Sequence, residues 1–273
     1  MNLMPDNLPT NLNAKQKLSQ INTFLLDLDG TFYLGDTLFP CSLGFIRRLE
    51  ELGKKYIFVT NNSSRNAAYY IAKLTKMGVR LQPDQVFTSG EATRYFLKNN
   101  QYSNNIYLVG TPDLEEEFRQ AGYNLAGDNP ATVVLGFDLT LTYSKLRRAC
   151  DLIRNGVPFI ATHPDFNCPT PEGPIPDCGS FIEAIKASTG VSPKIIGKPY
   201  PEMVAALCVK FDLDRQSVAM IGDRLYTDIA MGQQSGITSI LVLSGETRIG
   251  DLEGSPFQPD LIAADLGEVA EWL

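Results

Sequence analysis

Residues 24–35, with the sequence FLLDLDGTFYLG, are the stretch that decides the fold. An apolar run leads directly into Asp27 and Asp29, two carboxylates one residue apart, and Gly30 and Thr31 follow them. Side chains at positions i and i+2 of a strand point to the same face, so both carboxylates can line one pocket. Ligands of open parallel sheets bind beyond the carboxyl ends of the strands, and we expect these two acids at such an end.

Short apolar runs rich in β-branched and aromatic residues alternate along the chain with stretches of helical period, which predicts βαβ units. We therefore expect an α/β fold, with a doubly wound, Rossmann-like parallel-sheet core and an inserted α/β domain. The core strands are expected at 23–28, 55–60, 86–88, 218–222 and 239–243. The core helices are expected at 42–53, 65–78, 90–99, 201–212 and 226–236.

The middle of the chain, residues 101–191, repeats this alternation independently, with at least three further strands and three helices. The segment is too long and too regular to be a loop, so we expect it to be an inserted second domain. The first domain is then discontinuous and comprises residues 18–100 and 192–273. We expect residues 1–17 to form a loosely held N-terminal extension.

Charge and hydropathy exclude two classes of partner. The 273 residues carry a net charge of −7 and contain no run of Lys or Arg, so the basic surface of a nucleic-acid binder is not expected. The longest apolar runs, such as SILVL at 239–243, are far shorter than the roughly 18–20 residues that cross a bilayer. We therefore expect no nucleic acid polymer and no membrane among the partners.

The five cysteines are widely spread and include no C-x-x-C pair, so neither a disulfide framework nor a zinc site is indicated. Residues 1–20 are polar and lack the apolar segment of a secretory signal peptide. Both observations favour a cytoplasmic location. Cys168 and Cys178 lie in a proline-rich loop, where we expect small packing side chains rather than a redox pair.

Polar side chains follow two further strands. The run IFVTNN ends in Thr60, Asn61 and Asn62, which are neutral groups suited to phosphate or carboxylate oxygens. The run IIGKP places Lys198 just before an expected helix start. Any one of these residues could be an ordinary helix cap or turn residue. Their coincidence at several strand ends of one sheet favours an anion-binding site.

Two more carboxylates follow a fourth strand. The run VAMIGDRLYTD places Asp223 at the strand end and Asp228 five residues later. Together with Asp27 and Asp29 they make four acids at the same edge of the sheet. Like-charged carboxylates repel one another, so the set is expected around a hard cation, and a site with few carboxylates that shares its ligands with phosphate suits Mg²⁺.

These motifs together resemble those of a known family. The ordered set D-L-D-G-T (27–31), T-N-N (60–62), G-K-P (197–199) and G-D-R-L-Y-T-D (222–228) is similar to the four motifs of the haloacid dehalogenase (HAD) superfamily of phosphatases. The α/β insert between the second and third motifs resembles the cap domain of its NagD-like, p-nitrophenylphosphatase branch. The resemblance covers nearly the whole chain, and it implies a Mg²⁺-dependent phosphomonoester hydrolase.

The resemblance also implies roles for the carboxylates. Asp27 would be the nucleophile that forms an aspartyl phosphate, and Asp29 would protonate the leaving oxygen and later deprotonate water. The Asp27 carboxylate, the backbone carbonyl of Asp29 and the Asp223 carboxylate would hold Mg²⁺. Asp228 would lie in the outer shell of the metal and orient a bound water or the lysine of the third motif.

The phosphoryl group would be bound by the remaining motif residues. Thr60, Asn61, Asn62 and Lys198 would hold its oxygens, and Lys198 would also offset the charge that develops on them. Gly30 would let the backbone approach the ligand closely.

The cap is expected to select the substrate through the loop ATHPDFNCPTPEGPIPDCGS at 161–180. It holds His163, the only histidine, and Asp165, which resembles a cap position that reaches the active site in relatives. A lone histidine is also often structural. Nucleotide monophosphates and sugar phosphates are the favoured substrates, phosphoglycolate and pyridoxal phosphate remain open, and p-nitrophenyl phosphate would serve as an artificial substrate. The cap could also pair two copies into a homodimer.

Two other functions remain as alternatives. A phosphomutase or phosphotransferase of the same superfamily would use the same core residues. A non-hydrolytic phosphoacceptor or binding protein would also use clustered Asp, Lys and Thr, but such a domain is nearer to about 120 residues long. A dinucleotide-dependent dehydrogenase is disfavoured because no G-x-G-x-x-G follows the first strand.

Overall fold

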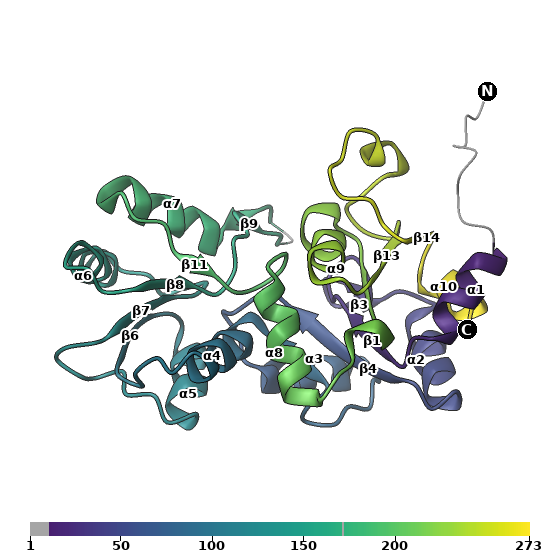
Figure 1. Cartoon of the computed structure of the whole chain (residues 1–273), viewed down its shortest axis with the longest axis horizontal. Coiled ribbons are helices and arrows are strands. Elements are labelled where there is room, and N and C mark those ends of the chain that lie inside the picture. Colours follow the sequence, from purple (N-terminus) through teal and green to yellow (C-terminus); the bar gives the residue numbers. More distant parts are fainter. Residues whose placement is uncertain (1–10, 171) are drawn as a thin grey trace. The chain divides into compact units, whose positions relative to one another are not determined.

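The computed structural model of the chain describes residues 11–170 and 172–273 (Figure 1). The helices are α1 (Asn11–Ser19), α2 (Ser42–Glu51), α3 (Ala67–Lys76), α4 (Ser89–Asn99), α5 (Pro112–Gln120), α6 (Tyr143–Arg154), α7 (Cys178–Thr189), α8 (Pro201–Phe211), α9 (Ala230–Ser235) and α10 (Leu266–Glu271). The strands are β1 (Thr23–Leu26), β2 (Tyr33–Leu34), β3 (Thr37–Leu38), β4 (Lys55–Thr60), β5 (Val86–Thr88), β6 (Ile106–Val109), β7 (Thr132–Leu135), β8 (Phe159–Ala161), β9 (Asn167–Cys168), β10 (Ile175–Pro176), β11 (Lys194–Ile195), β12 (Val218–Gly222), β13 (Thr238–Val242) and β14 (Leu261–Ala263).

The chain forms two compact units. The first contains the described residues up to Val59 together with Thr75–Gln85 and Cys208–Leu273, and the second contains Thr60–Leu74 and Val86–Leu207. The second unit includes the whole of the expected insert, 101–191, and further residues on both sides of it. The boundaries drawn between core and cap from the sequence stay a prediction.

Parallel strand pairs build the sheet of the first unit. β1 pairs with β12 on one side and with β4 on the other, and β13 and β14 follow beyond β12. The strand order therefore reverses at β1, which is the position where ligands of doubly wound sheets bind. The prediction of a doubly wound α/β core is confirmed, and the five expected core strands lie within two residues of their expected limits.

Apolar sequence on both faces explains why these strands are central. All four residues of β1 and all five of β12 are buried, as expected for a parallel sheet that is covered on both sides. Phe24 of β1 packs edge-on against Phe45 of α2, with ring centroids 6.2 Å apart. The buried residues of α2 recur at helical spacing, so one stripe of this helix faces the sheet.

The second unit has its own parallel sheet, in the order β11-β8-β7-β6. Figure 1 shows α6 and α7 on one side of this sheet and α4 and α5 on the other. Threonines fix the starts of three of these helices. The side chains of Thr88, Thr111 and Thr142 accept hydrogen bonds from backbone N–H groups in the first turns of α4, α5 and α6.

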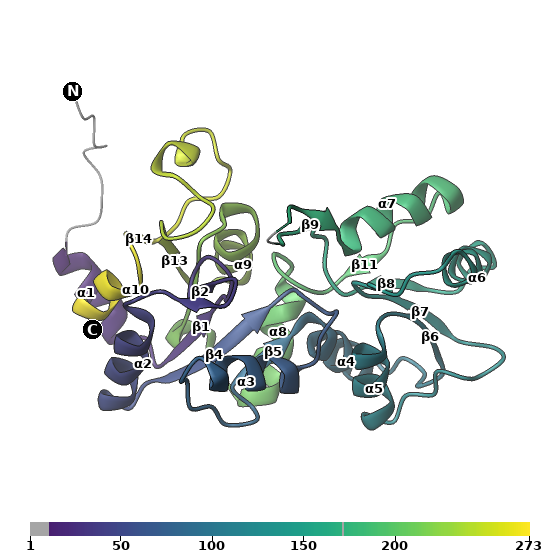
Figure 2. The ribbon, with the colours of Figure 1, turned by 180° about the vertical axis from the view of Figure 1, so that it is seen from behind.

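Part of the expected loose extension is ordered. Residues 11–19 form α1, in which Ala14 and Leu18 are buried and Lys17 makes an ion pair with Asp260. Figures 1 and 2 both show α1 beside α10. Among residues 12–19 of this polar helix, only Ala14 and Leu18 are buried, which is too few to give a recognisable apolar stripe in the sequence. The expectation for residues 1–10 lies outside the described residues.

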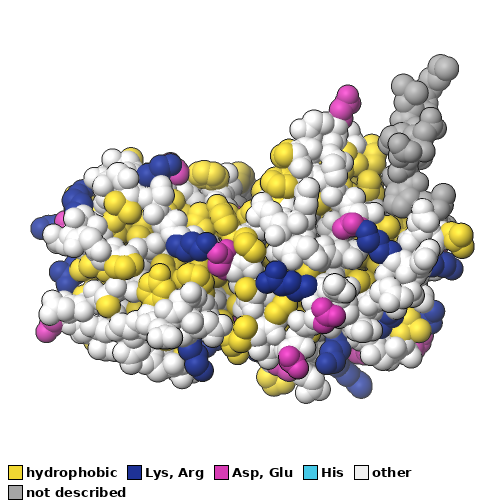
Figure 3. All heavy atoms as spheres, in the orientation of Figure 1, with side chains coloured by type: hydrophobic (Ala, Val, Ile, Leu, Met, Phe, Trp, Pro, Cys, Tyr) yellow, Lys and Arg dark blue, Asp and Glu magenta, His cyan; other side chains and the backbone are white. Residues whose placement is uncertain are grey.

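No helix within the described ranges is long and apolar enough to cross a membrane. Acidic and basic side chains are interspersed over the face of the molecule shown in Figure 3. All five cysteines lie in the described part of the chain and are free thiols, as the sequence predicts.

Candidate active site

Three of the four predicted acids come together in the first unit. Asp27 directly follows β1, and its N–H donates to the carbonyl of Ile221 in β12 at 2.9 Å, so the ladder of the sheet continues to this residue. Asp223 follows β12 directly. One carboxylate oxygen from each of Asp27, Asp223 and Asp228 lies within 4.8 Å of the other two. Asp29 is exposed and forms an isolated bridge with Tyr33 just beyond β1.

The carboxylate of Asp223 is held from several sides. Asp223 is only 1% exposed. Its Oδ2 accepts a hydrogen bond from the backbone N–H of Glu246 at 2.7 Å, and its Oδ1 lies 3.4 Å from the Thr31 hydroxyl. A Cβ atom at either Gly30 or Gly245 would overlap this carboxylate. Gly30 also has a φ of +86°, which favours glycine. These two glycines therefore let two backbone segments approach Asp223 closely.

A π-helical turn presents Asp228. The turn covers Leu225–Ile229, and α9 continues from it, so the helix expected at 226–236 starts with a wider turn. Asp228 is 0% exposed, and its Oδ2 accepts the N–H of Arg224 at 3.2 Å. A Cβ at Gly222 would overlap the Asp228 side chain, which explains why glycine precedes Asp223 in this motif. Such π turns are frequent at functional sites.

Arg224 is a charged neighbour that sequence reasoning missed. Burial by itself would lower the pKa of Arg224, but Tyr226 and the carboxylates of Asp27, Asp223 and Glu246 raise the pKa above its usual value. The guanidinium therefore stays protonated, and its Nε lies 2.9 Å from the Glu246 carboxylate. Glu246 follows β13, the next strand of the sheet, so the rule that located the other site residues would also have located this one.

The donor set fits a divalent cation. Mg²⁺ binds oxygens at about 2.0–2.1 Å, so two ligands on opposite sides of one ion are roughly 4.2 Å apart. The three carboxylates have oxygens within 4.8 Å of one another, which is compatible with a shared ion. Asp223 and Asp228 are buried, and buried anions require compensating positive charge. Arg224 supplies one such charge, but it also pairs with Glu246. A divalent cation would offset most of the negative charge that remains on the three carboxylates.

The second unit brings Asn61 and Lys198 together. The Asn61 side chain accepts the Lys198 N–H with Oδ1 at 2.8 Å and donates from Nδ2 to the Lys198 carbonyl at 2.9 Å. Thr60 is the last residue of β4, and its hydroxyl accepts the N–H of Asn62 at 3.1 Å. Lys198 is buried. A Cβ at Gly197 would lie 2.6 Å from Asn61 Oδ1, so the glycine of the G-K-P motif permits this contact.

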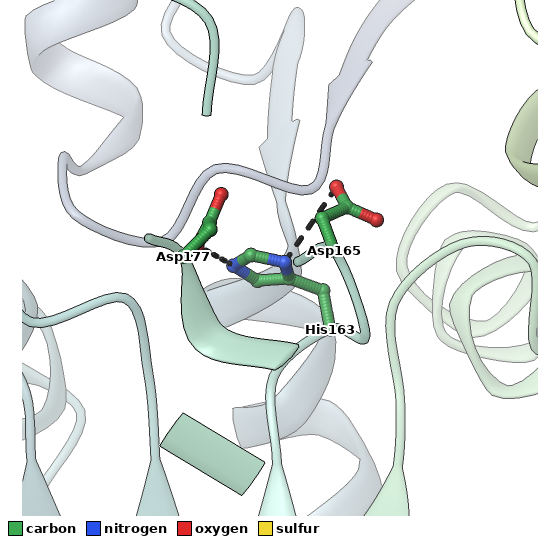
Figure 4. A group of neighbouring side chains, drawn as sticks. All are labelled: His163, Asp165 and Asp177. Carbon is green, nitrogen blue, oxygen red and sulfur yellow. Dashed lines mark ion pairs between the residues drawn. The ribbon is translucent and has the colours of Figure 1, made fainter. Parts of the chain in front are cut away.

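The proline-rich loop brings three more ionisable residues together, His163, Asp165 and Asp177 (Figure 4). His163 is 0% exposed, with Nδ1 3.6 Å from Asp165 and Nε2 3.4 Å from Asp177. Both oxygens of Asp165 lie 3.1 Å from Asn61 Nδ2. Asp165 therefore contacts a motif residue, whereas His163 has no exposed surface.

Charge coupling shifts the pKa values of this group. Burial by itself would lower the pKa of His163, but Asp177 and Asp165 raise it above its usual value, against a smaller opposing effect of Lys198. Burial by itself would raise the pKa of Asp165, but His163, Asn61 and Lys198 hold it below its usual value. Sequence reasoning missed Asp177, although its position as the N-cap of α7 was visible as an Asp before a helical stretch.

Comparisons with known proteins identify the family. The model of the haloacid dehalogenase-like hydrolases matches residues 24–124, and a second, HAD-hydrolase-like model matches residues 195–269. An acid sugar phosphatase of Staphylococcus aureus is 34% identical over 252 residues, which is 92% of this chain and 97% of the relative. The chain belongs to the haloacid dehalogenase-like hydrolases.

Solved structures give the branch of the family. A 4-nitrophenylphosphatase from Thermotoga maritima is 49% identical with a TM-score of 0.90, covering 93% of this chain and 98% of that one. A glycerol phosphate phosphatase from Mycobacterium tuberculosis, in complex with calcium, is 30% identical with a TM-score of 0.85, covering 93% and 76%. The predicted resemblance to the NagD-like, p-nitrophenylphosphatase branch is confirmed, and so is the prediction that the chain is a phosphatase.

Proposed function

We propose that this phosphatase hydrolyses small phosphorylated metabolites with Mg²⁺ as its cofactor, and that sugar phosphates are its principal substrates. The observation that carries the metal-dependent part is the cluster of Asp27, Asp223 and Asp228, with carboxylate oxygens within 4.8 Å of one another at the strand ends. The similarity to an acid sugar phosphatase and to a glycerol phosphate phosphatase supports the substrate class. Nucleotide monophosphates are the second class to test.

Two carboxylates carry out the bond changes in this proposal. A carboxylate oxygen of Asp27 attacks phosphorus, the bond between phosphorus and the leaving oxygen breaks, and an aspartyl phosphate forms. Asp29 donates a proton to the leaving oxygen and then accepts a proton from the water that hydrolyses the aspartyl phosphate. Its exposure, in contrast to the buried Asp223 and Asp228, is consistent with a group that must exchange protons with substrate and water. Mg²⁺ supplies positive charge to the phosphoryl oxygens.

The motif residues of the second unit divide into two roles. We assign Thr60, Asn62 and Lys198 to the phosphoryl oxygens. Gly30, which belongs to the first unit, is assigned to close approach of the backbone. The Asn61 side chain is already hydrogen-bonded to the Lys198 backbone and to Asp165, so its amide fixes these neighbours. The cap loop with His163 and Asp165, a homodimer formed through the cap and a cytoplasmic location remain parts of this proposal.

Phosphate release across a panel of esters tests the proposal. The panel contains sugar phosphates, nucleotide monophosphates and p-nitrophenyl phosphate, each assayed with Mg²⁺ and with a chelator, and with Asp27→Asn as the matched variant. We expect release that requires both the metal and Asp27, with sugar phosphates ranked first. Metal-independent release of phosphate would overturn the assignment of Mg²⁺ as cofactor. Full activity of Asp27→Asn would overturn the assignment of Asp27 as nucleophile.

The phosphomutase alternative predicts a different product. Hydrolysis in ¹⁸O-labelled water places one labelled oxygen in each released phosphate, because water attacks the phosphorus of the aspartyl phosphate. A mutase would instead return the phosphoryl group to an organic acceptor, so label would be absent from the product ester and little free phosphate would form.

A further inference from the structure

The buried ring of His163 lies between two carboxylates of its own loop. Asp165 faces Nδ1 and Asp177 faces Nε2, at 3.6 and 3.4 Å (Figure 4). Neither ring nitrogen has a hydrogen-bond partner among the described residues, so these contacts are ion pairs and not hydrogen bonds. A neutral imidazole would turn the lone pair of one nitrogen toward a carboxylate. The imidazolium presents an N–H and positive charge to both carboxylates.

The surrounding charges agree with an imidazolium. Asp177 and Asp165 favour the protonated ring, and their effect exceeds the opposing effect of Lys198. The neighbouring Cys178 thiol adds no charge, because burial, followed by Asp177, raises its pKa to about 12. Loss of the ring proton would leave a net negative charge in a buried place, which is costly.

A metal ion is a poorer occupant of this cluster. His163, Asp165 and Asp177 do offer ligand atoms within 4.8 Å of one another. However, the ring stands between the two carboxylates, with a different nitrogen directed at each (Figure 4). A metal ion binds a lone pair of the neutral imidazole, but both ring nitrogens here face a carboxylate, which favours the protonated ring. The positive charge of Lys198 also opposes binding of a further cation.

A chain of contacts connects this ring to the third motif. Asp165 lies against the amide of Asn61, and Asn61 holds the backbone N–H and carbonyl of Lys198. The loop cannot move away easily, because the Asp165 carbonyl accepts the N–H of Gly179 at 2.8 Å. Asp177 is tied to the start of α7 through the N–H of Cys178.

We propose that His163 is a positioning residue: as a buried imidazolium it holds Asp165 against Asn61, and Asn61 thereby fixes the backbone that carries Lys198. The importance of Lys198 for phosphate binding rests on the proposed function. The charge state of His163 and its contact with Asp165 do not.

Because His163 is the only histidine in the chain, its charge can be measured directly. Protein without an affinity tag, labelled with ¹⁵N only in histidine, gives one pair of ring nitrogen signals whose shifts distinguish imidazolium from neutral ring. We expect the pKa read from these signals to lie above the ordinary histidine value of about 6.5. A pKa at or below the ordinary value would overturn the proposal.

Asp165→Asn tests the contact without removing the histidine. Loss of an adjacent carboxylate should lower the pKa of His163 by about one unit or more, read from the same signals. An unchanged histidine pKa would show that Asp165 does not hold the ring. This readout needs no activity, so it remains valid if the protein fails to release phosphate.

His163→Gln tests the consequence for the site. We expect kcat/KM for p-nitrophenyl phosphate to fall by about 10–100-fold, and the decline of wild-type kcat/KM at alkaline pH, where the imidazolium is lost, to disappear in the variant. Ser180→Ala is the matched control, because it removes one hydrogen bond of the same loop, to the Phe166 carbonyl, without touching the charges. Equal pH profiles for His163→Gln and wild type would overturn the positioning role.

Discussion

Gly245→Ala should disturb the proposed metal site although it replaces none of the three carboxylates. A Cβ at position 245 would lie 2.5 Å from Cγ of Asp223, and real Cβ atoms essentially never come within 3.0 Å of another heavy atom. The carboxyl carbon of Asp223 and the backbone at position 245 must therefore separate by at least 0.5 Å more, the difference between these two distances, which displaces the carboxylate or the segment that packs against it. Mg²⁺ requires near-ideal octahedral geometry, so it tolerates such a displacement poorly.

We expect this change to weaken Mg²⁺ binding by about 10–100-fold, the range found for residues that orient metal ligands. Calorimetric titration with Mg²⁺ measures the affinity, and phosphate release at saturating Mg²⁺ shows how much turnover the metal restores. Gly250→Ala is the matched control, since a Cβ there would meet nothing within 4 Å. Wild-type Mg²⁺ affinity in a folded Gly245→Ala protein would refute the reasoning, because Asp223 would then not be a constrained metal ligand.

Three further outcomes follow from the structure. Asp27→Asn should nearly abolish phosphate release, and Asp29→Asn should slow it by roughly 10²–10⁴-fold; near-normal rates would contradict their roles. Because the pKa of His163 is raised in the folded protein, protonation of the ring should stabilise the fold, fully below about pH 6.5. This contribution should be lost as the pH rises through the folded-state pKa. Urea unfolding across that range should show a decline in the free energy of unfolding of the wild type and no such decline in His163→Gln. Gly44→Ala, at an exposed position of α2 with nothing within 4 Å of the new Cβ, should add about 0.5–1 kcal/mol to the free energy of unfolding, measured by the same method.

The core of the fold could be predicted because its strands are apolar on both faces. Runs such as VAMIG are short, continuous and bounded by polar residues, so both their type and their ends are visible in the sequence. The meeting of Asp27 with Asp223 follows from one rule, since both acids end parallel strands that the fold makes neighbours.

Other site contacts depend on tertiary structure that local patterns do not encode. Asp177 meets His163 only because the loop of residues 163–179 closes on itself, and no periodicity relates two residues fourteen positions apart. Besides its side-chain contact with Arg224, Glu246 donates its backbone N–H to Asp223, a group that every non-proline residue has. The contact therefore leaves no signature in the type of residue.

The π-helical turn at Leu225–Ile229 has a consequence for insertions and deletions. A π turn holds one more residue than the α-helical turn it replaces, so removing one residue would let the segment close as an ordinary α-helix. Each residue of an α-helix advances the side-chain direction by roughly 100°, and a deletion would rotate Asp228 away from Asp27 and Asp223. The number of residues in this turn is therefore under stricter constraint than the identity of exposed residues such as Tyr226. Homologues or engineered hybrids that retain the three carboxylates should differ in this turn by substitution and not by length.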